Sequence, residues 1–112
     1  MYNKDIILIK QMLLTIERIF EYTEKINNPD DFSDDYKTFD ATLMNFIALA
    51  EIVGKISEQY RNLNSFVEWR KIYAFRNIIA HDYFGIDEED VFDIIKNHLP
   101  ILKKELEKLL IS

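Results

Sequence analysis

The chain has no cysteine and very little glycine or proline, with two residues of each among its 112. The absence of cysteine excludes disulfides and zinc sites built on thiolates. The shortage of glycine argues against sandwich folds, whose tight turns use more of it, and the composition argues against disorder. No apolar run approaches the roughly 20 residues that a membrane-spanning helix needs. What is present, 48% hydrophobic and 13% aromatic residues, predicts a compact, mostly helical fold with one domain over residues 1–112.

Two patterns that would fix a location or an activity are also missing. Residues 1–5 lack the basic and then uninterrupted apolar pattern of a signal peptide. No glycine-rich phosphate loop is present, which argues against nucleotide hydrolysis. We therefore expect a cytoplasmic protein that has no membrane partner.

The charge is acidic overall and unevenly distributed. A formal net charge of −6 speaks against a nucleic-acid partner, because phosphate repels an acidic protein. Residues 55–76, however, hold five basic and two acidic side chains, a local balance of +3 that leaves −9 on the remainder. Much of that negative charge lies in residues 30–35 and 87–90. A local basic surface and ordinary solvated helix faces both fit this distribution.

Hydrophobic residues recur at helical spacing in four segments, at about residues 4–26, 33–56, 65–81 and 87–109. Asparagine and proline at residues 27–31 end the first, and residues 61–64 form a connector with room for a short helical turn. Asp87 is a suitable N-cap for the last segment, and Pro100 should kink it. The pattern predicts an all-α fold, an antiparallel bundle of four main helices with a short fifth at most.

Three other features have structural interpretations. Gly54, which costs about 1 kcal/mol relative to alanine in a helix interior, suggests close packing at that point. The aspartates within residues 30–35 lack the ligand spacing and glycine of a calcium loop, and predict an exposed acidic loop. His98 has no basic or polar cluster around it and is interpreted as a surface or packing residue.

The helix predicted over residues 65–81 has two distinct faces. Its core side carries Ile72, Phe75 and Ile79. Because an α-helix advances about 100° per residue, a polar stripe lies roughly 150–180° away; it contains Arg70, Asn77 and His81, flanked by Tyr73. Such a stripe suits the binding of phosphate groups, with Arg70, Asn77 and Tyr73 as candidate substrate contacts. A plain polar helix face explains the same stripe, and from the stripe alone it is the favoured interpretation.

Arg76 does not lie on that stripe. It projects at the border of the apolar side, about 140° round the helix from His81. Its stem can cover apolar surface while its guanidinium reaches solvent. Alternatively, the border belongs to a subunit interface and the guanidinium points into a cleft shared by two protomers. Within one chain, Arg76 and His81 converge only if the helix ends near His81 or the arginine reaches around it.

The stretch from Arg76 to Tyr83 combines three groups suited to phosphate chemistry. Arg76 is a fixed positive charge, His81 can exchange protons near neutral pH, and Tyr83 supplies a phenol. Together they match R-x4-H-x-Y, the motif of the HepT-like toxins in the HEPN superfamily of helical ribonucleases. Trp69 before the motif and residues 83–87 after it also resemble that family, as do the Val-Phe and Leu-Pro pairs of the last helix. The similarity spans essentially the whole chain.

The resemblance implies a function that composition and spacing do not show. It implies a homodimer whose two motifs face one cleft and cleave RNA without a metal, with Arg76 and His81 as catalytic residues. It also implies a small nucleotidyltransferase as antitoxin, which neutralises the toxin by attaching AMP to Tyr83. Tyr83 should then stand on an exposed turn, although it could instead pack against the last helix. The alternative function is a non-catalytic helical partner of a nucleotidyltransferase.

Overall fold

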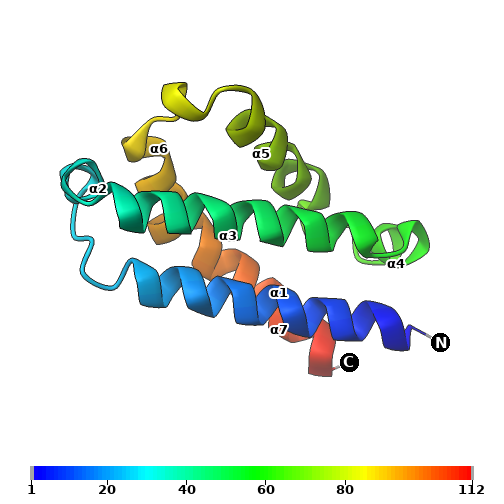
Figure 1. Cartoon of the computed structure of the whole chain (residues 1–112). Helices are drawn as coiled ribbons and strands as arrows, with labels where there is room; N and C mark the ends of the chain where they lie inside the picture. The colour runs from blue at the N-terminus through cyan, green and yellow to red at the C-terminus, as the bar shows by residue number, and fades with distance from the viewer. Residues whose placement is uncertain (1, 112) are drawn as a thin grey trace.

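The computed structural model describes residues 2–111, which form helices joined by short turns (Figure 1). The two longest helices are α1 (Asn3–Tyr22) and α3 (Tyr36–Lys55). The shorter helix α5 (Trp69–His81) comes later in the chain. The C-terminal part is helical from α6 (Glu88–Asp93) through a π-helical turn η2 (Ile94–His98) to α7 (Leu99–Ile111). The short elements are α2 (Pro29–Asp34), α4 (Glu58–Leu63) and the 3₁₀ turn η1 (Tyr83–Gly85).

Helix α3 is the centre of the arrangement, because it packs against α1 on one side and α5 on another. Helix α1 also packs against α7, and α2 packs against α6. Figure 1 shows α5 and η1 on the side of α3 away from α1. No strand occurs within residues 2–111, and the prediction of an all-α bundle is confirmed. The prediction of a short fifth helix underestimated the fold, which has both α2 and α4.

The core consists of the apolar stripes that helical spacing predicts. Four positions on α1 are fully buried, and they lie three or four residues apart: Ile9, Met12, Ile16 and Ile19. Val53 of α3 and Leu106 of α7 are also fully buried. Within residues 2–111 no helix is both long and apolar enough to cross a membrane.

The segment after α1 differs from the prediction. Helix α1 ends at Tyr22 and not near residue 26, because Thr23 begins a turn in which its hydroxyl donates to the carbonyl of Ile19 at 2.7 Å. The predicted acidic loop is wrong, because α2 begins at Pro29. Proline is favoured at the first helical position, where its missing N–H costs nothing, and the Asn28 side chain caps the turn.

The start of α5 was also predicted too early, at about residue 65. The backbone instead turns at residues 64–68, and the indole N–H of Trp69 donates to the carbonyl of Asn64 at 3.1 Å. Val67 is buried within this turn. A buried valine and tryptophan therefore anchor the N-terminal end of α5, while the helix itself starts at Trp69.

The C-terminal helix begins as predicted, since the Asp87 side chain accepts a hydrogen bond from the Glu89 backbone N–H at 2.9 Å. A kink was expected at Pro100, and the π-helical turn η2 ends two residues before that proline. Proline lacks an N–H, and its ring clashes with the carbonyl four residues earlier, here that of Lys96. A locally wider helix relieves that conflict.

One buried carboxylate, which the sequence pattern did not reveal, joins α1 to the start of α4. Asp5 is only 6% exposed. It accepts hydrogen bonds at 2.8 Å from both the backbone N–H and the hydroxyl of Ser57. The Ser57 hydroxyl in turn accepts from the Tyr60 backbone N–H and caps α4. Asp5 therefore fixes the corner at which the chain leaves α3.

Candidate functional site

Arg76 lies on the flank of α5 that faces α3, where it forms an ion pair with Glu51. The side chains of Arg76 and Glu51 are 39% and 48% exposed, respectively, so solvent reaches both. Neither sequence interpretation of Arg76 included this partner. The ion pair explains the border position, because a guanidinium at that angle can reach a carboxylate on the neighbouring helix.

Tyr83 stands on the exposed turn η1, as predicted, and is 40% exposed. Its hydroxyl donates a hydrogen bond to Asp40 of α3, and this bond raises the pKa of the Tyr83 phenol above its ordinary value. The ring of Tyr83 also contacts that of Phe84 edge-on, with centroids 5.0 Å apart. The phenol is therefore held by α3 while one side of it faces solvent.

His81 is the last residue of α5 and is exposed. Asp82 follows it as the helix C-cap, and its carbonyl accepts from the Gly85 backbone N–H at 3.1 Å. The Asp82 carboxylate lies against Gly85, where an added Cβ would come within 2.1 Å of a carboxylate oxygen. A side chain at position 85 would therefore have to displace the exposed Asp82 carboxylate, within the tight turn that places Tyr83 just beyond His81.

The predicted substrate contacts also lie on α5. Arg70 and Asn77 are exposed, as their place on the polar stripe requires. Tyr73 lies on the flank of α5 next to α3 and is 39% exposed. A Cβ added to Gly54 would approach Cε1 of the Tyr73 ring at 3.0 Å, so the close packing expected at Gly54 is present. The ring of Tyr73 covers α3, whereas Arg70 and Asn77 remain free to meet a ligand.

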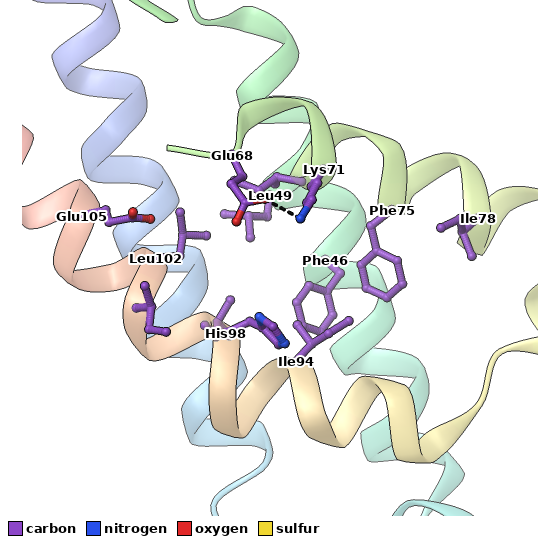
Figure 2. Close-up of a pocket in the computed structure, with 13 residues that line it drawn as sticks. Phe46, Leu49, Glu68, Lys71, Phe75, Ile78, Ile94, His98, Leu102 and Glu105 are labelled. Atoms are coloured by element: carbon purple, nitrogen blue, oxygen red, sulfur yellow. Dashed lines mark ion pairs between the residues drawn. The ribbon is translucent and has the colours of Figure 1, made fainter. Parts of the chain in front are cut away.

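An apolar groove of about 430 Å³ separates α5 from η2 and α7 (Figure 2). Its apolar walls include Phe46, Phe75 and Leu102, and polar side chains stand at its edge, among them the ion-paired Glu68 and Lys71. His98 also lines it and lies 3.3 Å from Asp93. None of Arg76, His81 and Tyr83 lines this groove. The motif therefore lies outside this groove.

Two acidic residues of α3 belong to the site, and the sequence did not single them out. Asp40 and Glu51 are eleven residues apart, close to three helical turns, and therefore share one face of α3. Asp40 contacts Tyr83 and Glu51 contacts Arg76. The shared face was readable from their spacing. Their partners were not, because the contacts depend on how α5 lies along α3.

The family model described as ribonuclease HepT-like matches residues 12–109, a range that includes the whole motif. This chain belongs to the HepT-like ribonuclease family. The HEPN-like fold expected from the motif is therefore confirmed together with the family.

Curated relatives of this HepT-like chain are similar over most of its length. A Thermococcus cleftensis protein named "Probable ribonuclease HepT" is 32% identical over 94 residues, which cover 84% of each chain. A Methanocaldococcus jannaschii protein named "Gamma-glutamylcyclotransferase and putative RNase" is 29% identical over 109 residues. That match covers 96% of this chain but 49% of the relative, so the HepT-like chain spans about half its length. No solved structure matches the chain significantly.

Proposed function

We propose that this HepT-like chain is the toxin of a toxin–antitoxin pair, a metal-independent endoribonuclease that acts in the cytoplasm. The observation that carries the proposal is the placement of Arg76, His81 and Tyr83 at the end of α5, in a chain of this ribonuclease family. All three side chains are accessible to a ligand, since His81 and Tyr83 are exposed and Arg76 is partly so.

The proposed reaction uses only groups of the chain and of the RNA. The ribose 2′-hydroxyl attacks the adjacent phosphorus while His81 moves a proton, a role that an imidazole ring can fill as general acid or base. Arg76 leaves Glu51 and stabilises the charge that grows on the phosphorane oxygens. Removing such a donor typically costs a factor of about 10²–10³ in rate. Arg70, Asn77 and Tyr73 are the proposed contacts to neighbouring parts of the RNA.

A homodimer is part of the proposal, because one chain does not gather the motif into a cleft. Arg76 faces α3, whereas His81 points about 140° away around a regular helix that ends at His81. Two exposed apolar side chains lie within or next to the motif: Ile78 is 56% exposed and Phe84 is 96% exposed. Two-fold pairing of these surfaces would bury both and face the two motifs across one groove.

Light scattering at micromolar concentration tests the dimer. The wild-type chain should have the mass of a dimer, and a double variant, Ile78→Ser with Phe84→Ser, should be a folded monomer that has lost RNA cleavage. Leu14→Ser is a matched control, because Leu14 is 58% exposed on α1, away from the motif. A monomeric wild-type protein that still cleaves RNA would contradict the dimer.

The proposed antitoxin is a small nucleotidyltransferase that attaches AMP to Tyr83. The turn η1 presents the phenol at the surface, where a second enzyme can reach it. A phosphate and an adenosine at this position would repel the RNA backbone and block the surface beside His81. Incubation with the partner and ATP should add AMP to the wild-type chain but not to Tyr83→Phe. If the Tyr83→Phe variant still takes up AMP, the modified residue is not Tyr83.

Expression of the chain alone tests the ribonuclease against its rival, a non-catalytic partner of a nucleotidyltransferase. A toxin should arrest growth, and sequencing of RNA ends should then reveal new cleavage sites and the RNA that is cut. Co-expression of the nucleotidyltransferase should restore growth. Normal growth on expression alone, with no new RNA ends, would favour the rival.

A further inference from the structure

We infer that Asp40 of α3 is a catalytic residue for the modification of Tyr83, in which it accepts the phenolic proton as the AMP group is transferred. The inference rests on the proposed modification and extends it to a residue outside the motif. Its basis is the hydrogen bond that the Tyr83 hydroxyl donates to the Asp40 carboxylate. The oxygen of that hydroxyl is the atom that would be modified.

The surroundings of Asp40 suit this role. Asp40 is partly buried on α3. Among residues 2–111 it forms no ion pair, and the Tyr83 hydroxyl is its one hydrogen-bond donor. The other carboxylate of the region, that of Asp82, lies against Gly85. A carboxylate without a cation keeps its lone pairs available, so Asp40 is the proton acceptor already in contact with the reacting oxygen.

The turn around Tyr83 fixes this contact. The Gly85 backbone N–H donates to the Asp82 carbonyl, and the Ile86 backbone N–H donates to the Tyr83 carbonyl. Tyr83 is 40% exposed even with its hydroxyl held by α3. One side of the phenol is therefore open to an incoming nucleotide, while Asp40 occupies another.

The chemistry needs such an acceptor. The hydrogen bond to Asp40 raises the pKa of the Tyr83 phenol, so the hydroxyl stays protonated at neutral pH and must lose its proton during transfer. The phenolic oxygen attacks the α-phosphorus of a nucleoside triphosphate delivered by the partner. An oxygen–phosphorus bond forms, the bond to the β-phosphate breaks, and pyrophosphate leaves with the electron pair. The phenolic proton passes to the Asp40 carboxylate and then to water.

The competing explanation is that Asp40 only tethers the turn. Asparagine separates the two roles, because its side-chain oxygen still accepts a hydrogen bond from the phenol but cannot take up the proton. Asp40→Glu keeps a proton acceptor on a longer side chain. Asp34→Asn is the matched control, since it removes the same charge from an exposed position of the neighbouring helix α2.

The experiment measures AMP transfer from ATP to the full chain by the partner nucleotidyltransferase, followed by mass spectrometry across a range of pH. We expect Asp40→Asn to lower kcat by about 10²-fold near neutral pH, the lower end for general base catalysis, without a change in the KM for the toxin chain. The rate of Asp40→Asn should rise towards wild type at alkaline pH, where the phenolate forms unaided. Asp40→Glu should recover part of the loss, and Asp34→Asn should behave as wild type.

The outcomes separate this inference from the function on which it rests. If the wild-type chain takes up AMP on Tyr83 and Asp40→Asn does so at the same rate, Asp40 has no catalytic role and the proposed function stands. A slow Asp40→Asn variant with a raised KM and no recovery at alkaline pH would make Asp40 a tether or a partner contact, which also overturns the inference. If wild-type Tyr83 takes up no AMP, both the modification and the role of Asp40 are wrong.

Discussion

Replacing Glu51 with glutamine should strengthen RNA binding by the chain. Glu51 holds the Arg76 guanidinium in an ion pair, and the proposed mechanism requires that guanidinium to contact a phosphate. The RNA must therefore displace the carboxylate. Glutamine keeps the size and polarity of the side chain but removes the charge that competes with phosphate.

The exposure of the pair sets the size of the effect. Because the Arg76 and Glu51 side chains are 39% and 48% exposed, water and salt screen their attraction. Such pairs are worth about 0.2–1 kcal/mol, which corresponds to at most about a fivefold change in affinity. Glu51→Gln should thus lower the KM for RNA up to about fivefold, leave kcat unchanged, and change the free energy of unfolding by less than about 1 kcal/mol.

The assay is cleavage of a short fluorescent RNA in EDTA, analysed for kcat and KM separately. Glu58→Gln is the control, because it removes the same charge from an exposed position on α4 that faces no motif residue. A fall in kcat on Glu51→Gln, with KM unchanged, would refute the reasoning. It would mean that Glu51 orients Arg76 for the reaction and does not compete with RNA.

Three further predictions test other contacts. Asp5→Ala should lower the free energy of unfolding in urea by about 1.5–3 kcal/mol, since the N–H and hydroxyl of Ser57 lose the buried carboxylate to which they donate. An unchanged urea midpoint would contradict the role of Asp5 at the α3–α4 corner. Gly54→Ala should raise that free energy by less than about 1 kcal/mol, because helix propensity improves while the half-exposed Tyr73 ring moves slightly; marked destabilisation would show that the ring cannot move. Arg70→Ala should weaken RNA binding and reduce its salt dependence by about one phosphate contact; an unchanged salt slope would remove Arg70 from the RNA surface.

The long helices could be predicted from the sequence because helical periodicity is a local property. Phe39, Leu43, Phe46 and Val53 recur at helical spacing, and all four are buried along α3. Helix ends were harder, because they depend on side chains that compete for backbone groups. The run around Pro29 shows this: it was expected to end the first helix, but that helix ends earlier, at Tyr22, and Pro29 starts another helix.

Of the candidate site, only the residues of the motif could be predicted from the sequence. Arg76, His81 and Tyr83 lie close together in the sequence, and the exposure of the turn followed from its position after α5. The carboxylates of α3 were not predictable. Asp40 and Glu51 are 43 and 25 residues away from Tyr83 and Arg76 in the sequence, and which charges meet depends on how α5 packs along α3.

The most direct measurement of the central claim is RNA cleavage in EDTA by the purified chain and by its two histidine variants. His81→Ala removes the proposed proton-transfer group, whereas His98→Ala removes the other histidine, which pairs with Asp93 away from the motif. We predict that the wild type and His98→Ala cleave RNA at similar rates and that His81→Ala does not cleave it. Cleavage by His81→Ala at the wild-type rate, or a wild-type chain that is inert towards RNA, would contradict the account.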